Sequence, residues 1–410
     1  MGERPPVVDW TTDFDHLTEE WAAQGPEILT DLRDRCPVPH TERFHGAYIV
    51  TRYDDVVAVA QDPGTFSSRV TMVTETHPDD IKLSLGPLTL DPPLHSPLRR
   101  ALLPTFNAKR VAELQPLMGG IVDELLDGLA DRDLVDGAAE FAELIPIRLM
   151  SHLFGVPPSH GLEFKGWVNG ILKDGLLDVQ VARDANRAAQ SYFVEALRAR
   201  RESGEWKPDL VSMVLDARVN EDEGSTRPLT EREQIGSLYV LMIGGIDTTW
   251  SLIGAALLHL GTHPADLARL VAEPERVPVA IEEFLRFYSP ATVGRVITQD
   301  ADIGGCPVDG GKRLLLSFPS ANRDAERFER PDEVVLDRQQ NRHIAFGVGI
   351  HRCIGSNLAR METEVALTGW LRRFPRFELA ADLTEIRWSN GAVRGPYNLL
   401  LRLLGSEPQS

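Results

Sequence analysis

Apolar residues recur at three- and four-residue spacing along most of this chain, and that spacing is typical of helices with one buried face. The pattern predicts helices near residues 108–130, 136–155, 183–203, 231–262, 278–288 and 355–374. Strand-like apolar runs are short and few, at residues 47–51, 313–318 and 398–403. Because these runs lie near both ends of the chain and between late helices, we expect a mainly α fold with a small β region beside the helical body.

The longest predicted helix has clear boundaries. Thr230 and Glu233 form a capping box at its start, and Gly261 and Pro264 mark its end. At about 1.5 Å per residue it would span roughly 45 Å, so we expect it to cross the centre of the molecule. Its apolar stretch could pass for a membrane span, but Asp247 lies at its middle, and a carboxylate is costly at that depth. The sequence therefore indicates a buried core helix and predicts no membrane segment.

The composition narrows the functional classes. The chain has 410 residues, with 43 Lys and Arg against 61 Asp and Glu, which gives a net charge of −18. Such an acidic surface argues against nucleic acid as a partner, because phosphate binding needs a basic footprint. The first residues lack the pattern of a secretory signal, and Cys36, Cys306 and Cys353 are too widely spaced for a disulfide framework. We expect a cytoplasmic protein with a single domain over 1–410 and loose termini at 1–12 and 404–410.

The segment FGVGIHRCIG at 346–355 surrounds one cysteine with glycines, directly before a predicted helix. Glycine permits positive φ and close backbone approach. A thiolate of Cys353 would face backbone N–H groups and the positive end of that helix, which lowers a thiol pKa and suits metal ligation. A buried structural cysteine in a turn is the alternative from these residues alone.

This segment resembles the ligand loop of the cytochrome P450 family, whose pattern fixes Phe, Gly, Gly, His or Arg, Cys and Gly. Every fixed position matches, and the resemblance continues in order from about residue 25 to about 400. It implies the family's fold, a triangular helical body that encloses haem b, with Cys353 as the iron ligand. It also implies that the cofactor lies against Phe346, Gly347 and Gly355.

The stretch LMIGGIDTT at 241–249 is a poor helix former, since each glycine costs about 1 kcal/mol relative to alanine. Thr248 can hydrogen-bond back to the Gly244 carbonyl and open the helix, which makes room for a small ligand. Close packing of another element against the glycines is the alternative. The stretch resembles the oxygen-binding helix of the same family. The resemblance implies that Gly244 borders the haem, that Thr248 hydrogen-bonds bound oxygen and that Asp247 relays protons from solvent.

Glu283 and Arg286 lie three residues apart on one face of a predicted helix and can form an ion pair. A pair with this spacing is most often on the surface. The resemblance identifies it with the family's Glu-x-x-Arg, completed by Arg338, and implies a structural network that holds the ligand loop. This chain has Val334 and Val335 where the family often has Phe and Asp, so the packing around the network differs.

His95 and Arg99 lie four residues apart at the start of a helical stretch, and their spacing alone indicates exposed side chains on one face. The resemblance assigns both to a haem propionate, together with Arg295 and His351. Two carboxylates on a buried cofactor require cationic partners, so this set of basic groups fits the chemistry.

The segment 338–360 contains several arginines and no acid, in a chain that is strongly acidic. A solvated face neutralised by neighbouring acids is one interpretation. A docking patch for an acidic electron donor, on the cysteine side of the haem, is the other and is favoured. Its docking residues would be Arg342, Arg352 and Arg360, with candidate neighbours Arg100, Lys109 and Arg110.

The resemblance implies a monooxygenase that inserts one atom of O₂ into a small to medium apolar or aromatic substrate, by hydroxylation or oxidative dealkylation. Electrons would come from a separate ferredoxin or flavin-type reductase. Substrate contacts are expected at 70–90, 160–180, 241–244, 291–294 and 391–396, with the apolar residues Leu83, Leu85, Leu88, Val293 and Val393.

Two other functions are compatible with a haem site of this kind. A peroxygenase would use hydrogen peroxide directly, but such members of the family typically lack the acid–threonine pair that Asp247 and Thr248 supply. A non-enzymatic haem sensor would need neither a proton relay nor a donor patch. The sequence therefore favours the monooxygenase.

Overall fold

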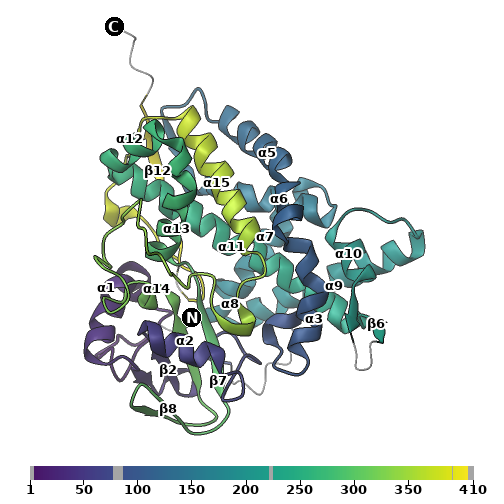
Figure 1. The fold of residues 1–410 in the computed structure, drawn as a ribbon, viewed down its shortest axis with the longest axis vertical. Helices are drawn as coiled ribbons and strands as arrows, with labels where there is room; N and C mark the ends of the chain where they lie inside the picture. The colour runs from purple at the N-terminus through teal and green to yellow at the C-terminus, as the bar shows by residue number, and fades with distance from the viewer. Residues whose placement is uncertain (1–3, 77–85, 221–224, 390, 405–410) are drawn as a thin grey trace.

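A computed structural model describes residues 4–76, 86–220, 225–389 and 391–404. Its outline is roughly triangular, with the main sheet, α12 and α10 toward the three corners (Figure 1). The longer helices are α1 (Glu19–Arg35), α5 (Gln115–Asp127), α6 (Leu144–Phe154), α7 (Pro158–Leu172), α9 (Val179–Ser203), α11 (Glu231–Thr262), α13 (Val277–Tyr288) and α15 (Ser356–Arg373). The shorter ones are α2 (Tyr53–Gln61), α3 (His95–Leu102), α4 (Ala108–Ala112), α8 (Asp174–Leu177), α10 (Leu210–Asp216), α12 (Pro264–Ala272) and α14 (Phe318–Ala321).

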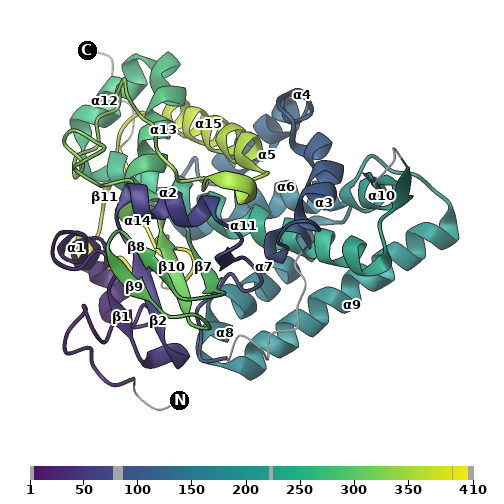
Figure 2. The same cartoon turned by 60° about the horizontal axis from the view of Figure 1, so that its bottom comes forward.

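The main sheet joins segments from both halves of the chain and lies beside the helical body (Figure 2). Its strand order is β1-β2-β10-β7-β3, and only the β2–β10 pair is parallel among these described strands. The strands are β1 (His40–Thr41), β2 (Ala47–Val50), β3 (Phe66–Ser67), β7 (Thr292–Ile297) and β10 (Arg313–Ser317). A second sheet has the order β11-β12-β4, from β4 (Leu134–Asp136), β11 (Phe377–Leu379) and β12 (Leu400–Leu403). Two hairpins pair β5 (Arg218–Asn220) with β6 (Thr226–Pro228) and β8 (Ala301–Ile303) with β9 (Cys306–Val308).

The expectation of a mainly α fold with a small β region is confirmed. Two predicted helices differ in detail. The segment predicted at 108–130 is broken into α4 and α5, because Pro116 lies in the first turn of α5 and cannot donate a hydrogen bond to a continuous helix. The segment predicted at 136–155 begins with a π-helical turn at Gly137–Ala142, capped by Asp136, before α6.

α11 forms the core of the molecule. Thr230 and Glu233 make the predicted capping box, and the helix runs from Glu231 to Thr262 against α6, α13 and α15. It is long and apolar enough to cross a membrane, but 78% of its most apolar window is buried inside the protein. Burial on this scale is what a core helix needs, so its apolar composition is explained by packing.

The described part of the N-terminal segment is anchored, which differs from the expected loose end. Arg4 donates to the Asp15 carboxylate over 2.6 Å, and Arg43 donates to the carbonyls of Pro5 and Pro6. Asp15 is fully buried, and a buried carboxylate needs cationic partners, so it draws both arginines onto the body.

Candidate functional site

The loop FGVGIHRCIG is shaped by its own backbone. The Cys353 N–H donates to the Phe346 carbonyl over 2.8 Å, which closes the loop just before α15. Gly347 and Gly349 have φ of +69° and +75°, where side chains are strained. A Cβ at Gly349 would also lie 2.6 Å from the Ala60 carbonyl oxygen. Glycine is therefore required at both positions for the loop to present Cys353.

The Cys353 side chain is accessible even though protein atoms surround it. Burial raises the pKa of its thiol, while the Gly355 backbone N–H and the guanidinium groups of Arg99, Arg352 and Arg360 act in the opposite direction. The helix start thus has the predicted effect and the arginines add to it, but burial outweighs them. This corrects the expectation that the loop by itself lowers the thiol pKa.

Basic side chains gather beside this loop. The His95 ring lies 4.3 Å from the His351 ring, centroid to centroid. His95 is buried, contrary to the exposure that its spacing indicated, because α3 packs into the body. Arg99 donates to the Arg352 carbonyl, and the buried Arg295 donates to the carbonyl of the residue before it over 2.7 Å. The structure therefore brings together the four residues that the resemblance assigned to the propionates.

Among the described residues, buried ring nitrogens of both histidines lack a hydrogen-bond partner. Both ring nitrogens of His95 and Nε2 of His351 are buried without a hydrogen-bond partner. Burial, followed by the charges of Arg295, His95 and Arg99, lowers the pKa of His351 to about 3. Burial lowers the pKa of Arg295 to about 10. Such mutual repulsion, with unpaired buried nitrogens, indicates a site that is completed by an anionic group.

The two glycines of α11 have different roles. A Cβ at Gly245 would lie 2.6 Å from the Met150 Sδ, so this glycine allows α6 to pack closely. A Cβ at Gly244 would meet no described atom within 4 Å. The Thr248 Oγ1 donates to the Gly244 carbonyl over 3.3 Å, as predicted. The sequence left two alternatives for these glycines, and both occur. Close packing applies at Gly245, and open space beside the helix applies at Gly244.

Asp247 lies inside the protein. Its side chain is 1% exposed, and its Oδ1 lies 2.9 Å from the Lys173 Nζ. The same oxygen accepts from the Trp250 indole N–H over 2.8 Å. The Lys173 ammonium also lies 4.7 Å from the ring centroids of both Trp250 and Tyr397. Asp247, the residue expected to relay protons, is therefore held in a buried ion pair beside two aromatic rings.

Sequence reasoning missed Lys173. It occupies the junction between α7 and α8, about seventy residues from its partner, so helical spacing could not link the two. One signal was available: Lys173 directly follows the apolar residues Ile171 and Leu172 inside the segment 160–180, where substrate contacts were expected. A carboxylate predicted within a core helix needs a buried cation, and such a lysine is the natural candidate.

The structure brings Glu283, Arg286 and Arg338 into one buried network. The Glu283 carboxylate accepts from Arg286 over 2.8 and 2.9 Å and from the Arg338 Nε over 2.9 Å. Arg286 also donates to the carbonyls of Asn322, Pro331 and Glu333. The Val335 N–H donates to the same carboxylate over 2.8 Å. The network thus fastens α13 to the chain that leads into the Cys353 loop.

Comparisons with known proteins agree with this arrangement. The family model for cytochrome P450 matches residues 176–399. Cytochrome P450 107B1 of Saccharopolyspora erythraea is 36% identical, over 86% of this chain and 88% of that protein. The chain belongs to the cytochrome P450 family. Mycinamicin IV hydroxylase/epoxidase of Micromonospora griseorubida is 34% identical, over 90% of this chain and 93% of that protein.

The solved structure of the cytochrome P450 PksS of the Bacillus subtilis 168 bacillaene polyketide synthase superposes with a TM-score of 0.86 and 30% identity. The superposition covers 96% of this chain and 100% of the solved PksS chain. This cytochrome P450 therefore has the family fold, and membership makes it an oxidoreductase of the monooxygenase type with a haem-thiolate iron.

The residues of this cytochrome P450 fit the haem that the family implies. The accessible thiol of Cys353 can ligate iron, and the unpaired nitrogens of His95 and His351 lie beside two arginines that suit carboxylate groups. Gly244 borders space on the α11 side. The guanidinium carbon of Arg360 lies 4.5 Å from the ring centroid of Phe346. This contact fixes the start of the loop.

The predicted donor patch is smaller than the sequence indicated. Arg338 is held inside the Glu283 network, and Arg360 forms a bidentate pair with Glu282 over 2.6 and 2.8 Å. Arg342 and Arg352 remain exposed. The alternative interpretation, a charge neutralised by a neighbouring acid, therefore applies at Arg360. The acid is Glu282, which comes from α13 and is distant in sequence.

Several segments predicted to touch substrate are described. Leu88 and Val293 are partly buried, and Val393 is buried. Ala291 and Val393 form a β-bridge, so the segments 291–294 and 391–396 lie side by side. Leu83 and Leu85 lie outside the described residues.

Proposed function

We propose that this cytochrome P450 inserts one atom of O₂ into an apolar organic substrate, with Cys353 as the ligand of a haem b iron. The observation that carries the proposal is the accessible Cys353 thiol beside buried nitrogens of His95 and His351 that have no hydrogen-bond partner among the described residues. A thiol that can ligate iron on one side, with two arginines and two histidines at the edge, suits an iron porphyrin with two carboxylates. Three free cysteines are consistent with a reducing cytoplasm.

The bound haem would supply the oxidising chemistry, and the protein would supply position and protons. Arg99, Arg295, His95 and His351 would bind and orient the propionates. The Thr248 hydroxyl would leave its weak bond to the Gly244 carbonyl and hold a proton toward the space beside α11. A threonine whose bond is as long as 3.3 Å can exchange that acceptor for a ligand at small cost.

Proton supply to Thr248 would come from Asp247, one residue earlier on α11. Because Lys173 pairs with Asp247 inside the protein, the relay needs this pair to open or a water to enter beside it. The second carboxylate oxygen of Asp247 is buried without a partner, so it is available to such a water. Lys173 would therefore act as a positioning residue that holds the carboxylate in place.

The substrate would be a small to medium apolar or aromatic molecule. Among the described residues predicted to contact it, Leu88, Val293 and Val393 are apolar. The names of the relatives favour hydroxylation or epoxidation of a natural-product substrate over dealkylation, since one of them is a hydroxylase/epoxidase of mycinamicin IV. A panel of macrolide and aromatic compounds, scored by the spin-state shift of the ferric haem, tests this class directly.

Electrons would arrive from a separate ferredoxin or flavin-type protein through the exposed Arg342 and Arg352. Arg352→Glu should slow reduction by an acidic ferredoxin and weaken its salt dependence, without changing the affinity for substrate. Arg187→Glu, an equal charge reversal at an exposed site on α9, is the matched control. Equal reduction rates in both variants would remove Arg352 from the docking site.

The iron ligand is tested by the reduced carbon monoxide complex. We expect the red-shifted Soret band of thiolate ligation in the native protein and its loss in Cys353→His. Cys36→Ser and Cys306→Ser should keep the band, because both thiols lie outside the ligand loop. Loss of the band in either control variant would assign the ligand to another cysteine.

A further inference from the structure

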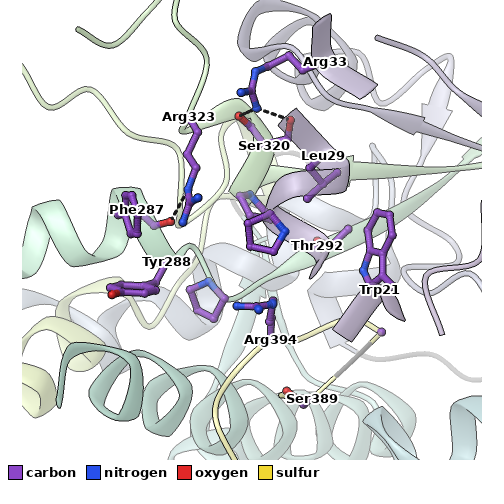
Figure 3. A pocket seen from close by; sticks show the side chains of 15 residues that line it. Trp21, Leu29, Arg33, Phe287, Tyr288, Thr292, Ser320, Arg323, Ser389 and Arg394 are labelled. Carbon is purple, nitrogen blue, oxygen red and sulfur yellow. Dashed lines mark hydrogen bonds between the residues drawn. The ribbon is translucent and has the colours of Figure 1, made fainter. Parts of the chain in front are cut away.

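A cavity of about 40 Å³ lies between α1 and the end of α13, away from the Cys353 loop (Figure 3). Its lining includes Arg33, Arg323 and Arg394, which come from three separate segments of the chain. Among the described residues of the lining there is no carboxylate. One water needs roughly 10–15 Å³ of such space, so this cavity holds more than a single water.

The three arginines differ in how far the protein satisfies them. Arg33 donates to both oxygens of Ser320, the carbonyl and the hydroxyl, over 3.1 Å. Arg323 donates through Nε to the Phe287 carbonyl over 3.1 Å, and its guanidinium carbon lies 3.7 Å from the Phe287 ring centroid. Figure 3 shows these bonds on either side of the cavity. The Arg33 guanidinium therefore has hydrogen-bond acceptors within the protein. Among the described residues, Arg323 has an acceptor only for its Nε.

Arg394 is the least satisfied of the three. Its Nη2 donates to the Ala22 carbonyl over 3.2 Å, and its guanidinium carbon lies 3.7 Å from the Trp388 ring centroid. Its Nε is buried with no hydrogen-bond partner among the described residues. The nearest acidic influence comes from Glu27, an exposed residue that forms no described ion pair with it.

Two guanidinium groups thus share a largely buried cavity without a carboxylate partner. Burial lowers the pKa of Arg394 to about 10, and the charge of Arg323 lowers it further in the same direction. Burial likewise lowers the pKa of Arg323 to about 10, although the charge of Asp332, which forms no ion pair with it among the described residues, acts in the opposite direction. Buried charges are normally paired, and the planar fork of arginine matches two oxygens of a carboxylate or phosphate. The cavity therefore has the charge, the free donors and the space for an oxyanion.

We propose that this cavity binds a small oxyanion, a phosphate or a carboxylate group, through Arg323 and Arg394. The proposal goes beyond the oxidation chemistry, because it concerns a site that the Cys353 loop and α11 do not share. The anion would accept from the unpaired Nε of Arg394 and from the free Nη groups of Arg323. An ordered water could take a single bond there, but it would leave the two positive charges unneutralised.

The cavity lies behind the paired segments 291–294 and 391–396, which are expected to contact the substrate. The Thr292 N–H donates to the Ala392 carbonyl over 2.9 Å, and the Arg394 N–H donates to the Pro290 carbonyl over 2.7 Å. Side chains alternate along such a pair, so Thr292 and Arg394 line the cavity while Val393 points the other way. A bound anion would therefore stiffen one wall of the predicted substrate site from behind.

Calorimetry on the haem-loaded protein in Tris chloride tests the proposal, with sodium phosphate, sodium acetate and sodium chloride as titrants at equal ionic strength. We expect saturable binding of phosphate or acetate and none of chloride. Phosphate alone would assign a phosphate group, and acetate as well would assign a carboxylate. Arg394→Gln should weaken binding at least about tenfold, the loss expected for one charge-assisted hydrogen bond. Arg187→Gln, an exposed arginine on α9, should bind as the native protein does.

Equal heats from chloride and the oxyanions, or unchanged binding in Arg394→Gln, would overturn the proposal. If Arg394→Gln does not load haem, hydrogen exchange on the native protein decides the matter. The segments 290–294 and 391–396 should exchange more slowly with the bound oxyanion than in chloride. The segment 179–203 should not change. Equal exchange of 290–294 and 391–396 in both salts would also overturn it.

Discussion

The cysteine side and the α11 side of the proposed haem site are held in opposite ways. On the cysteine side, Glu283 joins Arg286, Arg338 and the backbone of Val335, so a single carboxylate has several donors. On the α11 side, Thr248 has one bond of 3.3 Å and Asp247 leaves an oxygen unpaired. Multiple redundant bonds suit a ligand that must not move, while few and weak bonds suit groups that exchange partners during a reaction.

Removal of Arg286 should have the largest effect. Arg286→Leu leaves Glu283 buried with one cation fewer and strands the carbonyls that Arg286 served. We expect the free energy of unfolding to fall by about 3–5 kcal/mol or more, with loss of haem incorporation. Urea unfolding and the haem-to-protein absorbance ratio measure this. Arg198→Leu, which removes an exposed ion pair on α9, should cost less than about 1 kcal/mol. Similar losses of unfolding free energy in both variants would show that the buried network stabilises the protein no more than an exposed ion pair does.

Loss of Lys173 should cost less, because Asp247 can take up a proton. Lys173→Met should lower the free energy of unfolding by about 1–3 kcal/mol, since it leaves a buried carboxylate without its cation. Adding Asp247→Asn to Lys173→Met should recover most of that loss, because a neutral amide needs no cation. A double variant that is less stable than either single variant would show that the pair does not act as a unit.

Thr248→Ala tests the α11 side with a smaller energetic effect. The variant should bind haem and consume NAD(P)H, but product formed per NAD(P)H should fall about tenfold, with hydrogen peroxide in its place, because the proton is no longer guided. Thr248→Ser keeps the hydroxyl and should restore most of the coupling. Parallel assays of reductant, peroxide and product measure this. Full coupling in Thr248→Ala would assign the proton to another donor.

Glu282 offers the mildest test, by pH. Burial alone would raise the pKa of Glu282, but hydrogen bonds from Arg360 and His343 outweigh it and lower the pKa to about 2. Glutamate in an unfolded chain has a pKa of about 4.3. The Glu282–Arg360 pair therefore stabilises the protein above that pH, and this stabilisation is lost as the pH falls toward 2. Glu282→Gln should remove that dependence, at most about 1 kcal/mol because the pair is partly exposed. Coincident pH profiles of native protein and variant would contradict this.

The comparison also explains what the sequence could and could not predict. The start of α11 was predictable to the residue, because a capping box is local in sequence. The Cys353 loop was predictable because its glycines have local backbone roles. The Lys173–Asp247 pair and the Arg360–Glu282 pair join residues 74 and 78 positions apart, and local spacing carries no information about such contacts. The break between α4 and α5 was visible as Pro116 but was masked by the apolar periodicity around it.

The main sheet has a consequence for how the chain is made. β2 pairs with β10, and β3 pairs with β7, so strands synthesised early wait for partners more than two hundred residues later. Loop closure over such distances is slow, and unpaired strands attract other chains in the meantime. While the ribosome is still producing the helices, residues 40–67 therefore remain exposed to aggregation. Expression at low temperature, or with chaperones that hold nascent strands, should raise the yield of soluble protein.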